Sequence, residues 1–225
     1  MNKSMNEKLL LATMILFFSQ VANPLISKPM SEIITFSKSV DSFKKQLFKG
    51  DFSLVQEVLP GEYAITSATS SKPVLATCGL GPCVSLAGYN KTYKVAFLTH
   101  YRVGSNVLWS YNNLVKELLV FTNKKAKFEL TLVGGEKNYS EGLINIIKSK
   151  INSESRLEMS LIEEDTLDFK SSVSWATINR TNSIDSRIGK TYAYDPFLNP
   201  HQRTLPIHLN NYLTKLLSDK LVYHP

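Results

Sequence analysis

The strongest constraint in this sequence is a glycine-punctuated segment that joins two apolar runs and carries a cysteine. Val74–Thr77 is aliphatic and strand-like, and a second apolar run begins at Val84. Two glycines and a proline interrupt the chain between these runs, and Cys83 follows them directly. The pattern predicts a strand, a tight turn and a second strand, with a thiol at the end of the turn.

A histidine follows the next strand-like run. Tyr93–Thr99 is mostly apolar and delivers His100 at its end. One thiol on a glycine turn and one imidazole at a strand end are the minimum set for thiolate nucleophilic catalysis. Thr77 is placed to orient the imidazole, which is the part of the third group in a catalytic triad.

The turn itself would supply the rest of such a site. Gly79 and Gly81 let the backbone approach a substrate closely, and amides of the loop would form an oxyanion hole. The loop residues assigned to substrate or oxyanion contact, besides the amide of Cys83 itself, are Gly79, Leu80, Gly81 and Val84.

The residues alone are also compatible with a simpler interpretation, in which the cysteines have no catalytic part. Cysteine is among the most buried residue types, and a cysteine in an apolar run is commonly inert core. Cys78 follows Thr77, so strand alternation should send its side chain to the opposite face and into the core. The alternative is an oxidised bridge from Cys78 to Cys83, five residues on, that would block the nucleophile.

Composition narrows the class of protein. The chain has 225 residues, 43% hydrophobic and 20% charged, which suits one ordinary domain with appendages. The net charge of +7 comes without a Lys/Arg block or an aromatic-basic ladder, which argues against nucleic-acid binding. Two cysteines without nearby ligands exclude a disulfide scaffold and predict no metal site, and we expect no cofactor.

Four regions are expected along the chain. Residues 1–22 combine Lys3 and Lys8 with an apolar run and predict a signal peptide, with export or membrane association. An uncleaved anchor, a buried helix and a cytoplasmic location remain open alternatives, and any membrane contact would run through this segment. Residues 23–60 form an N-terminal extension, 61–195 the main domain, and 196–225 a proline-containing tail with a short helix.

Strands and helices are mixed along the main domain. Further strands are expected near Glu62–Ile65, Lys127–Val133, Leu157–Ile162, Ser172–Ile178 and Thr191–Tyr194, and helices after a Ser105 N-cap, over Tyr139–Ile151 and over Ile207–Leu217. No strict strand–helix alternation is present. The sequence therefore predicts an α+β fold, a layered α/β/α domain with mixed sheets and flanking helices.

Several of these motifs together resemble a known family. Gly61-Glu62-Tyr63-Ala64, then Thr77-x-Gly-Leu-Gly-x-Cys83-Val84, then His100 seventeen residues after the cysteine, resemble the CheD family of chemoreceptor glutamine deamidases. Leu132-Val133-Gly134-Gly135 resembles the glycine pair that follows a strand in that family. The similarity runs from about Gly61 to Tyr194.

The resemblance implies a protein-glutamine glutaminase, a cysteine hydrolase that converts glutamine side chains to glutamate through a thioester. Its Thr, Cys and His correspond to Thr77, Cys83 and His100. It also implies a glutamine-bearing protein substrate such as a chemoreceptor, and a CheC-like phosphatase partner from chemotaxis. Two departures stand out: Pro82 precedes the cysteine where a small residue is usual, and Leu167-Asp168 replace glycines. The alternatives are a non-catalytic binding protein on the same scaffold and a transglutaminase-like acyl transferase.

Overall fold

The computed structural model describes residues 45–169, 180–201 and 221–223 of the chain. They form two β-sheets and two α-helices, so the α+β class expected from the sequence is confirmed. Three expectations lie outside the described residues: the signal segment at 1–22, the strand at Ser172–Ile178 and the helix at Ile207–Leu217. Trp175, His208 and His224 lie outside them as well.

The elements follow the predicted apolar runs closely. The strands are β1 Val55–Glu57, β2 Glu62–Ser67, β3 Val74–Thr77, β4 Val84–Asn90, β5 Val95–Thr99, β6 Lys127–Glu136, β7 Glu158–Phe169, β8 Asn182–Asp185, β9 Lys190–Tyr192 and β10 Val222–Tyr223. The helices are α3 Val107–Phe121 and α4 Glu141–Ser153, with 3-10 turns at Phe52–Leu54 and Pro196–Leu198.

The strands divide into a larger and a smaller sheet. The six-stranded sheet has the order β10-β2-β5-β4-β6-β7, and the four-stranded sheet has the order β1-β3-β8-β9. In the larger sheet β4 pairs antiparallel with both β5 and β6, whereas β7 is parallel to β6. Parallel strands need a crossover connection between them. Helix α4, which lies between β6 and β7 in the chain, forms this connection.

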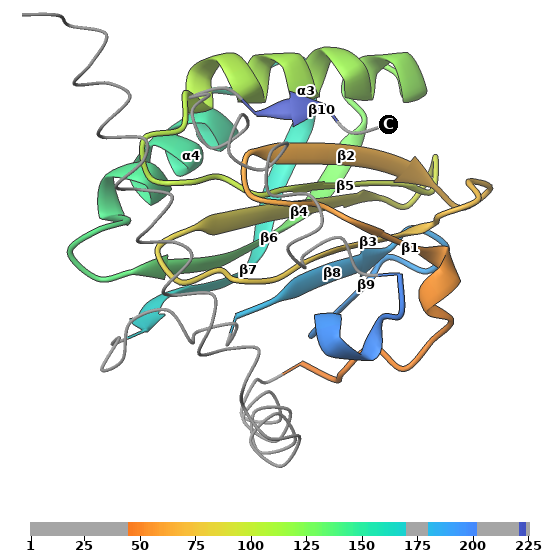
Figure 1. Ribbon diagram of the computed structural model, residues 1–225. Coiled ribbons are helices and arrows are strands. Elements are labelled where there is room, and N and C mark those ends of the chain that lie inside the picture. The colour runs from red at the N-terminus through yellow and green to blue at the C-terminus, as the bar shows by residue number, and fades with distance from the viewer. Residues whose placement is uncertain (1–44, 170–179, 202–220, 224–225) are drawn as a thin grey trace, which may run out of the picture. The chain divides into compact units, whose positions relative to one another are not determined.

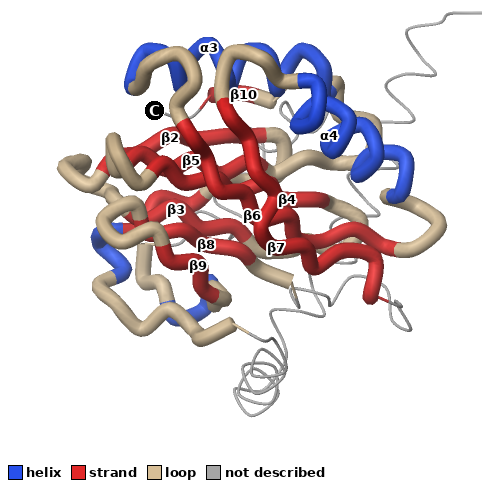
Figure 2. Tube along the Cα trace, turned by 180° about the vertical axis from the view of Figure 1, so that it is seen from behind, coloured by secondary structure: helices blue, strands red, loops and turns tan. Residues whose placement is uncertain are grey.

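The two sheets and the helices form three layers. Figures 1 and 2 show α3 and α4 on one face of the six-stranded sheet and the four-stranded sheet on its other face. Strand β4 is buried along its whole length because both of its faces are covered. The described layers are therefore helix, sheet and sheet, and the α/β/α order expected from the sequence is not confirmed among these residues.

Each interface between layers has its own apolar cluster. The helices and the large sheet share the largest cluster, which includes Phe97, Leu114, Leu130 and Ile147. Fully burying a side chain of this size stabilises a fold by about 1.5–3 kcal/mol. A second cluster, hereafter the inter-sheet layer, lies between the sheets and consists of Val58, Ala64, Leu75, Ala87, Tyr89, Ala96, Leu98 and Ile184.

The small sheet extends the domain toward the N-terminus. Strand β1 pairs in parallel with β3, and Phe48 joins Val55 and Tyr194 in an apolar cluster of that sheet. The compact unit that contains every described residue begins at Val40. Strand β1 therefore precedes Glu62–Ile65, the earliest strand expected from the sequence.

The N-cap of helix α3 lies one residue after Ser105, the predicted cap. Asn106 Oδ1 accepts the Trp109 N–H at 3.1 Å, so Asn106 and not Ser105 is the N-cap. Ser105 Oγ instead accepts the Arg102 N–H at 2.9 Å and closes the preceding turn. Trp109, on the same helix, is 41% exposed.

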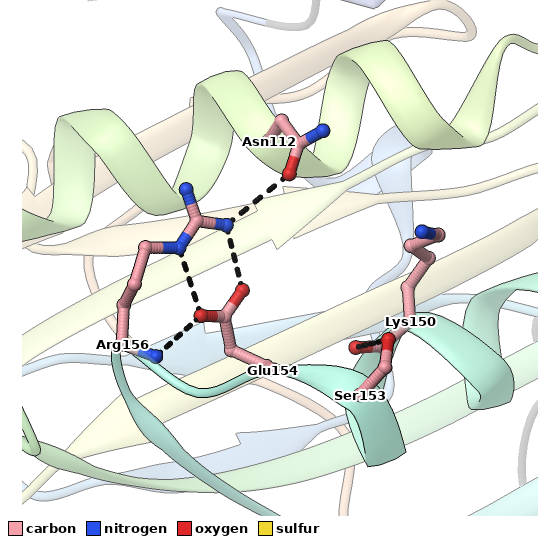
Figure 3. Close-up of polar contacts among 5 residues, drawn as sticks. All are labelled: Asn112, Lys150, Ser153, Glu154 and Arg156. Carbon is pink, nitrogen blue, oxygen red and sulfur yellow. Dashed lines mark hydrogen bonds and ion pairs between the residues drawn. The ribbon is translucent and has the colours of Figure 1, made fainter.

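A cluster of polar contacts ties α3 to the turn after α4. The Arg156 guanidinium donates to both carboxylate oxygens of Glu154, at 2.9 and 2.7 Å, and also to Asn112 Oδ1 on α3 at 3.2 Å (Figure 3). At the end of α4, Ser153 Oγ donates to the Lys150 carbonyl at 3.4 Å. These contacts hold the turn that leads from α4 into β7.

Candidate active site

One end of the inter-sheet layer is polar. Strand alternation places Thr77 on the same face of β3 as Leu75, and His100 on the same face as Leu98. Leu75 and Leu98 belong to the apolar cluster between the sheets, whereas Thr77 and His100 follow it at the ends of their strands. Both polar side chains are buried, with 2% and 0% of their surface exposed.

A hydrogen bond joins Thr77 to His100 across the two sheets. Thr77 Oγ1 lies 2.7 Å from His100 Nδ1 and 2.6 Å from the Val58 carbonyl oxygen. The hydroxyl has one proton, and only the hydroxyl can donate to the carbonyl. The His100 Nδ1–H therefore donates to Thr77 Oγ1, which leaves Nε2 unprotonated. Nε2 is buried and has no hydrogen-bond partner among the described residues.

The Gly61-Glu62 pair fixes the backbone around this histidine. The Gly61 N–H donates to the His100 carbonyl, and the His100 N–H donates to the Glu62 carbonyl, both at 2.9 Å. The Glu62 carboxylate accepts the Leu59 N–H at 3.0 Å and shapes the turn that follows Val58. This motif thus holds both the imidazole and the carbonyl that orients Thr77.

The strand register places Cys83 on the same face as His100. Val84 and Tyr101 exchange two backbone hydrogen bonds, at 2.9 and 2.8 Å. Ser85 therefore lies opposite His100. Cys83 is the diagonal neighbour of His100, at a distance that long side chains can bridge. Cys83 is partly exposed, and no hydrogen bond joins its thiol to His100 Nε2 within the described part of the chain.

Three hydrogen bonds anchor the cysteine loop from other parts of the fold. Ser140 Oγ donates to the Pro82 carbonyl at 2.7 Å, and the Gly135 N–H donates to the Cys83 carbonyl at 2.9 Å. The Leu80 N–H donates to the Arg180 carbonyl at 3.0 Å. The Ser140 hydroxyl also accepts the Glu136 N–H at 2.9 Å, so it links the loop to the start of α4.

This anchoring decides which amides can bind a substrate oxygen. The Leu80 N–H and the Val84 N–H both donate to backbone carbonyls, so neither is free to donate to a substrate oxygen in this structure. The amides of Gly79, Gly81 and Cys83 donate to no acceptor among the described residues. These three N–H groups are the candidates for stabilising negative charge at a carbonyl oxygen.

The Gly134-Gly135 pair is required by the close approach of the cysteine loop. Gly134 has a φ of +105°, and a Cβ there would lie 2.4 Å from the Cys83 carbonyl oxygen. Gly135 has a φ of +88°, and a Cβ there would lie 2.8 Å from Ile144 Cδ1. Larger residues at these positions would displace either the loop or α4.

Burial favours the neutral forms of both His100 and Cys83. It lowers the pKa of His100 from 6.5 to about 3, against weaker raising effects of the Val58 carbonyl and Glu62. It raises the pKa of Cys83 from 9.0 to about 11, and the nearby Arg102 charge opposes this shift only partly. A thiolate–imidazolium pair is therefore not formed at neutral pH.

Cys78 lies outside this arrangement. Its side chain packs with the cluster of Phe48, Val74 and Tyr194 on the face of the small sheet away from His100, and burial raises its pKa to about 12. Both cysteines are free thiols. The side chain of Cys78 thus points away from His100, as expected, and is partly buried at the edge of this cluster.

Sequence reasoning missed four residues of the site. Ser140 and Arg180 anchor the loop, and Ser85 and Asn182 extend the polar end of the inter-sheet layer. Ser140 directly precedes α4, a position at which serine ordinarily caps the helix by itself. No local signal marks Arg180 or Asn182, because only the pairing of β8 with β3 brings them to the site.

No known protein-family model matches the chain, and no curated protein matches it either. Among residues 45–169, 180–201 and 221–223, no group of three or more His, Cys, Asp or Glu side chains is arranged to hold a metal ion. Nor does any helix in those ranges have the length and apolar character needed to span a membrane.

The lowered pKa of His100 predicts a specific loss of stability in acid. The unfolded chain binds a proton at His100 below about pH 6.5, whereas the folded chain does so only near pH 3. The free energy of unfolding should therefore fall as pH drops through this window, by at most about 1.4 kcal/mol per pH unit from this residue. Urea unfolding of wild type and His100→Gln at several pH values measures it; parallel curves for the two proteins would contradict a buried neutral His100.

The contact between Gly134 and the cysteine loop gives a second prediction. Gly134→Ala should destabilise the fold by about 2 kcal/mol or more, because the new methyl group overlaps the Cys83 carbonyl at a strained φ. Gly142→Ala on α4 is the matched control, since a Cβ there meets no atom within 4 Å. It should be neutral or stabilise by up to about 1 kcal/mol. Equal effects of the two substitutions in urea unfolding would show that the loop does not press on Gly134.

Proposed function

We propose that this protein is a cysteine-dependent protein-glutamine deamidase, with Cys83 as nucleophile, His100 as general base and acid, and Thr77 as the group that orients the imidazole. The observation that carries the proposal is the 2.7 Å contact between Thr77 Oγ1 and His100 Nδ1. It leaves an unprotonated Nε2 on the strand face that also bears Cys83. The resemblance to the CheD family supports the same assignment of roles.

The reaction begins with both groups neutral. As Cys83 Sγ forms a bond to the carboxamide carbon of glutamine, its proton passes to His100 Nε2. The carbonyl oxygen gains negative charge, and the free amides of Gly79, Gly81 and Cys83 are the available donors to it. The C–N bond then breaks with its electron pair on nitrogen, the proton on Nε2 moves to that nitrogen, and ammonia leaves.

Water completes the cycle. It attacks the thioester carbon and gives a proton to His100 Nε2, and the C–S bond breaks with its electrons on sulfur. The proton returns to Sγ, and the product side chain is glutamate. Each step uses one base in one tautomer, which the Thr77 contact maintains.

The backbone at Leu167 is compatible with the resemblance. Leu167 has a φ of +64°, a conformation that favours glycine over a side chain as large as leucine. The resemblance leads us to expect a glycine at this position, and a glycine would adopt this conformation without strain.

A specific observation also favours a second candidate, a non-catalytic binding protein on the same scaffold. The thiol of Cys83 has a raised pKa and makes no hydrogen bond to His100 Nε2 in the described part of the chain. A protein that has kept the architecture without activity would show both features. The deamidase remains the better-supported function, because a buried Nε2 that serves no reaction carries a desolvation cost without benefit.

The target and location belong to this proposal as well. A glutamine-bearing protein is the substrate, with a chemoreceptor and a CheC-like phosphatase partner as the candidates drawn from the family. The N-terminal segment favours export or membrane association, and a cytoplasmic enzyme is the alternative. A transglutaminase-like transferase differs from a deamidase only in resolving the thioester with an amine.

Activity should depend on the three residues to different degrees. With casein as the glutamine-bearing probe, ammonia release and peptide mass spectrometry should show deamidation by the wild type. Cys83→Ala and His100→Ala should each lower the rate about a thousandfold or more. Thr77→Val should cost roughly tenfold to a hundredfold, and Thr77→Ser should restore most of it, because only the hydroxyl holds the imidazole. Full deamidation by Cys83→Ala would refute the mechanism, and joined chains would indicate the transferase.

The raised pKa of Cys83 predicts how its thiol responds to pH. In the Cys78→Ser background, alkylation of Cys83 by iodoacetamide should rise with pH through the neutral range and level off only near pH 11. The sign follows from burial, which favours the neutral thiol and thus delays thiolate formation to higher pH. A rate that is already level below pH 7 would instead reveal a preformed thiolate–imidazolium pair.

A further inference from the structure

Four buried side chains form a closed polar ring between the two sheets: Thr77, Ser85, His100 and Asn182. Thr77 and Asn182 are direct partners in the pairing of β3 with β8, and Ser85 lies opposite His100 in the pairing of β4 with β5. Hydrogen bonds close the ring across the sheets, from His100 to Thr77 at 2.7 Å and from Asn182 Nδ2 to Ser85 Oγ at 3.4 Å. Asn182, like His100, is 0% exposed.

Two acceptors of this ring have no partner among the described residues. They are His100 Nε2, whose lone pair the tautomer leaves free, and Asn182 Oδ1. Leaving a buried acceptor without a donor costs about 1–3 kcal/mol. Because the two side chains belong to one ring, we expect a single group with two N–H or O–H bonds to satisfy both. A water molecule, an ammonia molecule and a primary carboxamide nitrogen all fit this description.

We infer that Asn182 Oδ1 and His100 Nε2 together receive the nitrogen of the substrate carboxamide, which makes Asn182 a specificity-determining residue. The inference rests on the proposed deamidase function. Cys83 directly precedes β4, and alternation places it on the same face as Ser85, two residues away. We therefore expect an acyl group on its sulfur to lie beside the ring. Asn182 accepts one N–H throughout, and His100 supplies the proton as the C–N bond breaks.

This arrangement selects the substrate by its nitrogen. A primary carboxamide can donate one N–H to Asn182 Oδ1 while its nitrogen receives the proton from His100 Nε2. A substituent on that side of the nitrogen brings a carbon against the Asn182 oxygen and leaves this buried acceptor unpaired. The ring therefore favours cleavage of a primary carboxamide over cleavage of a peptide bond.

The test compares two leaving groups on one peptide. The casein peptide that the wild type deamidates fastest is prepared with its glutamine intact and with that side chain replaced by the γ-methyl ester of glutamate, whose methoxy group has no N–H. Full-length Asn182→Ala should lose roughly tenfold to a hundredfold in kcat/KM for the amide and much less for the ester. The amide-to-ester ratio is the readout, because a general loss of structure lowers both rates.

Two further variants separate specificity from packing. Ser183→Ala is the matched control: Ser183 is buried on the same strand and donates to the Tyr192 carbonyl at 3.2 Å, away from the ring. It should leave the ratio unchanged. Asn182→Asp keeps an acceptor oxygen and should retain the amide preference, while its negative charge should move the acid limb of the pH–rate profile upward by favouring protonated His100.

The outcomes are distinct. An amide-to-ester ratio that falls in Asn182→Ala alone supports the inference. A wild type that turns over the amide, with a ratio unchanged in folded Asn182→Ala, overturns it and leaves Asn182 as the site of an ordinary buried water. A wild type that hydrolyses neither peptide contradicts the proposed function itself, and the assignment of Asn182 fails with it.

Discussion

The hydrogen bond between Thr77 Oγ1 and His100 Nδ1 is the interaction on which the rest of this site depends. It joins the last residue of β3 in the small sheet to the residue after β5 in the large one, so it exists only if the two sheets pack in one register. The apolar cluster between the sheets sets that register. The bond in turn fixes one tautomer of the imidazole, and thereby decides that Nε2 and not Nδ1 can exchange a proton with Cys83.

Burial both protects and restrains the chemistry. The inter-sheet layer excludes water from His100, which lowers the pKa of the imidazole to about 3 and keeps it a neutral base. It also raises the pKa of the Cys83 thiol to about 11, so the proposed nucleophile is a neutral thiol at neutral pH. A site of this kind transfers its proton as the substrate bond forms, and it leaves the thiol largely unreactive toward other electrophiles at neutral pH.

The loop that carries Cys83 is held as firmly as the histidine. Ser140, Gly135 and Arg180 each bond to its backbone. Within the part of the chain that the structure describes, the amides of Gly79, Gly81 and Cys83 have no acceptor. Because these donors are fixed before a substrate arrives, they cost little reorganisation when charge develops on an oxygen.

The sequence predicted the local parts of this structure and missed the distant ones. Apolar runs located β3, β6 and α4 to within a few residues, because buried strands and helices are rich in apolar residues at a regular spacing. Thr77 and His100 were paired correctly because each sits at the end of a recognisable strand. Asn182 and Arg180 could not be found, since they reach the site only through the pairing of β8 with β3, about a hundred residues apart in the chain. Serine and asparagine are both common N-cap residues, so the sequence alone does not distinguish Ser105 from its neighbour Asn106, which is the cap.

The protonation state of His100 tests the account most directly. Long-range proton–nitrogen correlation spectra of the protein labelled with ¹⁵N at histidine report which ring nitrogen carries the proton. At neutral pH the account predicts a neutral ring protonated at Nδ1, with an unprotonated Nε2, and loss of that preference in Thr77→Val. An imidazolium, or a ring protonated at Nε2, would contradict it.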